Sequence, residues 1–131
     1  MNSEEIFTKN QKSLFFDTYA FFEILKANED YEEYSEVGII TTKLNLFELY
    51  LGILREKNEI EAEKVLDLYY PFTKEFDEGV IKEAAKLKNK MNKRDVSMTD
   101  CIGYCFAKQL GIKFLTGDKE FENLPNVEFV K

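Results

Sequence analysis

The sequence contains no histidine and no tryptophan, and only two cysteines and two prolines, among its 131 residues. Histidine is the commonest general base and the commonest zinc ligand. Its absence excludes serine–histidine and cysteine–histidine nucleophile pairs within this chain. Any chemistry must therefore depend on carboxylates, hydroxyl groups, lysines or a metal ion. Cys101 and Cys105 lie four residues apart in one helical pattern, which is neither a disulfide framework nor a zinc spacing, so we expect small core residues.

Long apolar runs are absent too, since none approaches the roughly 20 residues needed to span a bilayer. Residues 1–13 are polar and charged, unlike a secretory signal, so we expect a cytoplasmic protein. The length predicts one domain over residues 14–131 after a lead-in over residues 1–13. The formal net charge of −7 argues mildly against a surface built wholly for nucleic-acid binding, although the local distribution matters more than the sum.

One acid, Asp17, follows directly after an apolar run. Leu14 to Phe16 predict a short buried strand, and the apolar residues after Thr18 recur at helical spacing. Asp17 therefore lies where a strand ends and a helix begins, at the edge of the sheet where open α/β proteins bind ligands. A buried carboxylate needs backbone N–H groups, a cationic partner or a metal ion to compensate it. The simpler alternative is that Asp17 only caps the helix.

The remaining chain alternates between buried-strand and helical patterns. Further strands are predicted over residues 37–41, 112–116 and 127–130, and helices over residues 18–26, 42–57, 60–69, 77–91 and from 97 to a glycine at 111. Residues 28–36 are expected to form a loop or short surface helix, and residues 69–72 a turn or a short strand cut by proline. The pattern predicts an α/β fold, a three-layer α/β/α domain with a mainly parallel sheet of four to five strands.

Three more acids occupy comparable places. Asp118 follows the strand predicted over residues 112–116, and so lies at the same edge as Asp17. Glu48 is the only charge in an apolar run over residues 44–54, which predicts a helix buried on nearly all faces that encloses this acid. Asp100 lies in the first turn of the helix that begins near residue 97.

Each of these acids also has a purely structural alternative. Ser97 and Asp100 nearly match a capping box, and Asp118 can cap a short helical turn. Glu48 can lie on a narrow exposed stripe near Asn45. If the four acids do converge, they repel one another and recruit a cation, and an all-oxygen ligand set suits Mg²⁺ or Mn²⁺.

Four short patches carry a resemblance to a known family. They are Asp17-Thr18, Glu48-Leu49-x-x-Gly52, Asp100 with Ala107 seven residues later, and Thr116-x-Asp118-x-x-Phe121. In order and spacing they resemble the signature patches of PIN-domain nucleases, most of all the small VapC-like toxins of prokaryotic toxin–antitoxin pairs. The resemblance spans about residues 14–130.

This resemblance implies a Mg²⁺- or Mn²⁺-dependent endoribonuclease with a sheet ordered roughly 3-2-1-4-5. For such an enzyme we hypothesise that a metal-activated water attacks the phosphorus in line and leaves a 5′-phosphate and a 3′-hydroxyl. The resemblance also implies a homodimer and an antitoxin protein whose tail covers the active site. The metal-binding acids would be Asp17, Glu48, Asp100 and Asp118, with Thr116 and Thr18 as their hydroxyl neighbours.

The sequence departs from the family pattern at three places. Tyr19 stands where many relatives carry a small residue, Gly117 stands where an arginine is common, and the lead-in is longer than usual. These departures leave the four acids intact, and they bear on substrate preference and on a basic residue beside Asp118.

The most basic stretch, residues 86–94, has two interpretations. It can be a solvated helix face, or it can hold an RNA backbone, in which case neutralising Lys86, Lys88 and Lys90 weakens RNA binding. The aromatic residues Tyr31, Tyr34, Tyr69 and Tyr70 can serve an interface or be isolated surface side chains.

Two rival functions remain open on the sequence alone. An aspartate-nucleophile phosphatase or a receiver domain also places an aspartate at a strand end, but residue 19 is tyrosine rather than a second aspartate, and no acidic pair precedes Asp17. A non-catalytic module with a PIN-like fold is the other alternative, although such a module has no need for four acids in apolar settings.

Overall fold

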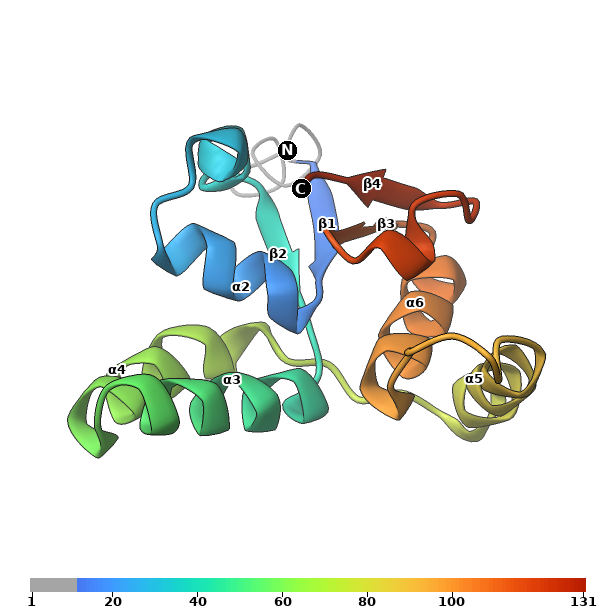
Figure 1. Ribbon diagram of the computed structural model, residues 1–131, viewed down its shortest axis with the longest axis horizontal. Coiled ribbons are helices and arrows are strands. Elements are labelled where there is room, and N and C mark those ends of the chain that lie inside the picture. The colour runs from blue at the N-terminus through green and yellow to red at the C-terminus, as the bar shows by residue number, and fades with distance from the viewer. Residues whose placement is uncertain (1–11) are drawn as a thin grey trace, which may run out of the picture.

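The computed structural model describes residues 12–131 (Figure 1). Most of the lead-in, residues 1–11, lies outside the described residues. The division of the chain after residue 13 therefore stays a prediction, although Ser13 is already the first residue of a strand.

A parallel four-stranded sheet forms the centre of the molecule. Its strands are β1 (Ser13–Phe16), β2 (Gly38–Ile40), β3 (Lys113–Thr116) and β4 (Val127–Phe129). They lie in the order β2-β1-β3-β4, with every neighbouring pair parallel. Within the described chain a single parallel bridge between Thr41 and Thr73 lies beyond β2. The expected order is thus present with its outermost strand reduced to one bridge, because Pro71 belongs to a 3₁₀ turn, Tyr70–Phe72.

Helices cover both faces of this sheet, which makes the three-layer α/β/α fold that the sequence predicts. They are α2 (Thr18–Leu25), α3 (Lys43–Glu56), α4 (Glu59–Tyr69), α5 (Glu78–Lys90) and α6 (Met98–Leu110). Figure 1 shows α2, α3 and α4 on one side, and α5 and α6 on the other. Each begins and ends within two residues of its predicted bounds.

The period-two alternation of β1 supplies both halves of the core. Leu14 and Phe16 pack into the cluster with α2, α3 and α4, while Phe15 packs into the cluster with α5 and α6. On the first side, a Cβ at Gly52 of α3 would collide with the ring of Phe22. The absence of a side chain at Gly52 therefore lets α2 and α3 approach closely.

The prediction that the helix over residues 42–57, which is α3, is buried on nearly all faces is wrong. Phe47 is 70% exposed and Leu54 is 41% exposed, whereas Asn45, near which the alternative placed an exposed stripe, is 1% exposed. Glu48 is half-buried rather than enclosed. The helix lies in an outer layer, so α2 and α4 cover only part of its surface, and the excess of apolar residues remains uncovered.

The expectation that the tyrosines of residues 28–36 lie at the surface is also wrong. This segment forms a 3₁₀ turn, Glu29–Tyr34, in which Tyr31 and Tyr34 are buried. The Tyr31 hydroxyl donates to the carbonyl of Val130, and the Tyr34 hydroxyl donates to Glu128 at 2.7 Å. Both contacts join the turn to the end of β4. Tyr69 is buried as well, and of the four tyrosines only Tyr70 is exposed.

Cys101 is buried and Cys105 is half-buried, and both are free thiols in α6, as expected. Within residues 12–131, no helix has the length and apolar character required to cross a membrane.

Candidate active site

Asp17 is both a helix cap and a buried acid. It is 1% exposed, directly after β1, and its Oδ1 accepts a hydrogen bond from the backbone N–H of Ala20 at 2.7 Å. Burial raises the pKa of Asp17 from 3.8 to about 8, although hydrogen bonds from the Thr116 side chain and from Ala20 oppose the rise. Capping and a functional role, which the sequence left as alternatives, are therefore compatible: the cap accounts for one oxygen and leaves the desolvation largely uncompensated.

The neighbouring strand end carries Thr116 and Asp118. Thr116 is the last residue of β3 and is fully buried, and its Oγ1 accepts a hydrogen bond from the Asp118 N–H at 3.0 Å. Asp118 in turn caps a 3₁₀ turn through Oδ1, which accepts from the Glu120 N–H at 3.0 Å. Because β1 and β3 are adjacent and parallel, Thr116 lies beside Asp17 and bonds to its carboxylate.

Glu48 is connected to the start of α2 by a chain of hydrogen bonds. Thr42 Oγ1 donates to Asn45 Oδ1 at 2.7 Å, Asn45 Nδ2 donates to Thr18 Oγ1 at 3.3 Å, and Thr18 Oγ1 donates to Glu48 Oε1 at 2.7 Å. Sequence reasoning missed Thr42 and Asn45. A signal was available for Asn45, since it precedes Glu48 by three residues and so shares its helix face.

Asp100 lies in the first turn of α6 and forms the predicted capping box with Ser97. The Ser97 N–H donates to Asp100 Oδ2 at 3.3 Å, and the Asp100 N–H donates to Ser97 Oγ at 3.0 Å. Burial raises the pKa of Asp100, hydrogen bonds from Ser97 lower it, and the charges of Asp118 and Glu48 raise it. The charges of Asp100 and Asp118 likewise raise the pKa of Asp17. Asp17 and Asp100 thus each lie within range of the charges of two other acids of the set, although the acids come from separate elements.

The donor set is that of a hard cation rather than of zinc. Its side-chain groups are carboxylates and hydroxyls, which suit Mg²⁺ and Mn²⁺. Across residues 12–131, the ion pairs of the lysines and arginines all go to other acids. As their side chains stand, no three potential ligands in that part of the chain converge into a group that could hold a metal ion. The chemistry of the site thus fits a divalent cation, while the carboxylates point to their local N–H and O–H donors.

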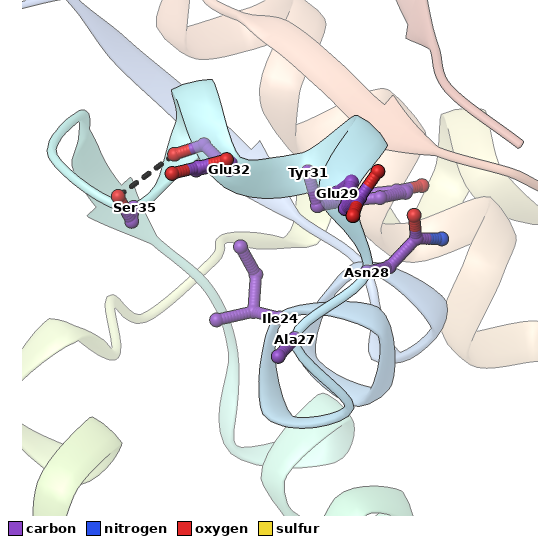
Figure 2. Close-up of a pocket in the computed structure, with 7 residues that line it drawn as sticks. All are labelled: Ile24, Ala27, Asn28, Glu29, Tyr31, Glu32 and Ser35. Carbon is purple, nitrogen blue, oxygen red and sulfur yellow. Dashed lines mark hydrogen bonds between the residues drawn. The ribbon is translucent and has the colours of Figure 1, made fainter.

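A separate hollow of about 330 Å³ lies between the end of α2 and the following 3₁₀ turn (Figure 2). It is lined by Ile24, Ala27, Asn28, Glu29, Tyr31, Glu32 and Ser35. None of Asp17, Glu48, Asp100 and Asp118 lines this hollow, so it is separate from the candidate active site.

The model of one protein family, described as the PIN domain, matches residues 14–127. No curated protein sequence matches this chain. Three solved structures share its fold at 14–15% identity. The Mycobacterium tuberculosis toxin VapC20, described as cleaving the sarcin–ricin loop, has a TM-score of 0.73, covering 90% of this chain and 99% of its own.

The other two structures come from complexes. A toxin–antitoxin complex from Klebsiella pneumoniae gives a TM-score of 0.67, at 14% identity, over 88% of this chain and 95% of its own. VapBC2 from Rickettsia felis, bound to a DNA fragment from its promoter, has a TM-score of 0.66 at 15% identity. The match covers 90% of this chain and 97% of that structure's chain. At such low identities the likeness is one of fold.

Proposed function

Because this chain belongs to the PIN domain family, we propose that it is a metal-dependent endoribonuclease of the VapC type. The observation that carries the proposal is the setting of Asp17: a buried carboxylate with no ion pair to a described cation, and within range of the charges of Asp100 and Asp118. Such a group is costly to keep ionised without a positive charge beside it. In a metal-dependent nuclease that positive charge is the cofactor.

PIN-domain nucleases generally use divalent metal ions, and we propose Mg²⁺ or Mn²⁺ here. The residues that would hold the ion are Asp17, Glu48, Asp100 and Asp118. A divalent ion held there would lower the pKa of water, so that hydroxide is available to attack phosphorus near neutral pH, and would stabilise the charge that develops on the phosphate.

Hydrogen bonds from the protein's own side chains and backbone position these acids. The Thr116 side chain bonds to the Asp17 carboxylate, while Thr18, which Asn45 contacts from α3, holds Glu48. The Ser97 backbone fixes Asp100 at the start of α6. In the proposed mechanism these contacts position the acids for the metal ion, and an RNA phosphate is cleaved there to leave a 5′-phosphate and a 3′-hydroxyl.

The direct test is cleavage of purified tRNA and ribosomal RNA with Mn²⁺ or with a chelator. Asp17→Asn and Asp100→Asn should each lower the cleavage rate by at least about a hundredfold, because the amide carries no charge to bind the ion, while Asn still caps a helix. Asp77→Asn is the matched control: Asp77 caps α5 through the Val80 N–H at 3.2 Å but is exposed. This control should cut like the wild type.

A non-catalytic RNA-binding module is the alternative function, favoured by the capping contacts that already occupy Asp17, Asp100 and Asp118. It predicts that the wild-type protein binds RNA and leaves it intact with either metal. It also predicts that the asparagine variants bind RNA as the wild type does. Cleavage by the wild type that is lost in both variants rejects this alternative.

We also propose an antitoxin partner and a homodimer, since two structures of similar fold are toxin–antitoxin assemblies. The uncovered apolar surface of α3 and α4 supports a protein partner: Phe47 is 70%, Ile60 68% and Leu68 56% exposed. A groove there is lined by Lys43, Leu46, Phe47, Tyr50, Glu63, Leu66 and Tyr70. Light scattering on the isolated protein tests the dimer, and a monomer at micromolar concentration contradicts it.

A further inference from the structure

Tyr19 occupies the space that a side chain at residue 117 would need. Tyr19 lies in the first turn of α2, two residues after Asp17, and its ring rests on Gly117. A Cβ on Gly117 would lie 2.6 Å from Tyr19 Cζ and 2.6 Å from the carbonyl oxygen of Val130. The two departures from the family pattern are therefore one feature: residue 117 has no side chain, and a phenol takes its place beside Asp118.

The ring is held in this position by its neighbours. Its centroid is 6.4 Å from that of Tyr31, with 44° between the planes, and Tyr31 is followed by Tyr34 at 5.9 Å. Tyr31 and Tyr34 are buried and bonded to the end of β4. Tyr19 itself remains partly exposed. Of these three rings, only that of Tyr19 therefore reaches solvent, at the edge of the sheet where β1 and β3 end.

The hydroxyl groups near the acids differ in whether they already have a hydrogen-bond partner. Thr18 donates to Glu48, and the Thr116 side chain bonds to Asp17. The Tyr19 hydroxyl has no hydrogen-bond partner among the described residues, and it is not enclosed. A phenol is an uncharged donor at neutral pH. Phosphate oxygens need such donors at an edge that otherwise presents carboxylates, and tyrosine hydroxyls commonly contact nucleic-acid backbones.

We propose that Tyr19 is a substrate-positioning residue whose hydroxyl donates a hydrogen bond to the RNA backbone beside the scissile phosphate. The proposal rests on the ribonuclease function above. Within that function it assigns a contact to a residue outside the four acids and their supporting hydroxyls.

Tyr19→Phe is the sharpest test because it removes one oxygen atom and keeps the ring on Gly117. With a labelled single-stranded oligoribonucleotide and Mn²⁺, the KM should rise about tenfold, as expected for a lost hydrogen bond to a charged group, while kcat stays within about twofold. The affinity of the metal-free protein for the same RNA should fall by a similar factor. Tyr34→Phe is the matched control, since it removes a hydroxyl from the same row of rings on the Glu128 side. It should keep the wild-type KM.

The outcomes separate this proposal from the ribonuclease function. If the wild type cleaves the RNA and Tyr19→Phe has the same KM and affinity, the proposal is overturned and the ribonuclease function stands. A lower thermal midpoint and a lower kcat with unchanged KM would assign Tyr19 a structural role and also overturn it. A wild type that neither binds nor cleaves RNA overturns both.

Discussion

At the scale of single residues, the carboxylate of Asp17 is costly to ionise where it lies, because it is buried after β1. The Asp17 pKa rises to about 8 because the side chain is buried, so the folded protein favours the protonated acid. The contribution of protonated Asp17 to stability is complete below its ordinary pKa of 3.8 and is lost as the pH rises through about 8. In the absence of metal, ionised Asp17 should therefore destabilise the fold.

Asp17→Asn should relieve this cost, because the amide keeps the cap and never ionises. In chelator, its free energy of unfolding relative to the wild type should grow by a few kcal/mol, as an order of magnitude, between about pH 5 and about pH 8. Urea unfolding at both pH values measures the difference.

Asp77→Asn is a control at a residue whose contribution to stability changes with pH in the opposite direction. The Val80 N–H lowers the Asp77 pKa, so the stability contributed by this cap is present at neutral pH and is lost as the pH falls. Removing its charge should give no gain at about pH 8. A gain as large as that of Asp17→Asn would show that general charge, not burial, is responsible.

Residue-level reasoning found the strand-end acids because an apolar run followed by one acid marks where a strand stops. It did not find the hydrogen-bond chain from Thr42 through Asn45 to Thr18, because that chain depends on α2 and α3 packing together over Gly52. The contact between Tyr19 and Gly117 was not predicted either, because the expected strand order makes β1 and β3 neighbours without specifying where the Tyr19 ring packs.

At the scale of elements, several side chains of the basic stretch, residues 86–94, make contacts that stabilise the fold. Lys88 Nζ donates to the carbonyl of Val96 at 2.7 Å, Lys86 pairs with Glu83 at 3.4 Å, and Arg94 pairs with Glu120 at 3.6 Å. Lys88 thereby fixes the loop that leads to α6 and Asp100. A variant that removes Lys88 would disturb the site as well as the charge, so it cannot test RNA contact by itself.

Lys90 and Lys93 are exposed and make a cleaner test. If this face holds an RNA backbone, changing both to glutamine should weaken RNA binding and lower the slope of log K against log salt by roughly 1.4 to 1.8. Lys64→Gln on α4 is the control, since Lys64 pairs with Glu61 at 3.4 Å on the other side of the sheet. An unchanged slope in the double variant would identify a solvated face.

Helix α3 shows why element positions were easier to predict than their surroundings. Its bounds follow from local periodicity and from the Thr42 cap, which the chain carries in its own sequence. Which of its apolar faces is covered depends on neighbours from elsewhere in the chain. The exposure of Phe47 could therefore not be read from the apolar run that contains it.

At the scale of the whole molecule, the alternation of strands and helices was enough to predict a parallel sheet between two helical layers. The order of the strands came from the family resemblance, because sequence periodicity does not say which face each crossover helix takes. The fold places Asp17 after β1, Asp118 after β3, and Glu48 and Asp100 on α3 and α6, and the charges of neighbouring acids raise the pKa of both Asp17 and Asp100. In the proposed function a divalent ion relieves this repulsion.

The most direct test of this account is calorimetric titration of Mn²⁺ into the wild type, Asp17→Asn and Asp77→Asn at neutral pH. The wild type should bind Mn²⁺ with proton release, because a largely protonated Asp17 must ionise to bind the ion. The affinity should be lower by at least about tenfold in Asp17→Asn and unchanged in Asp77→Asn. Absence of binding to the wild type, or equal binding by all three proteins, would contradict a metal site at this edge of the sheet.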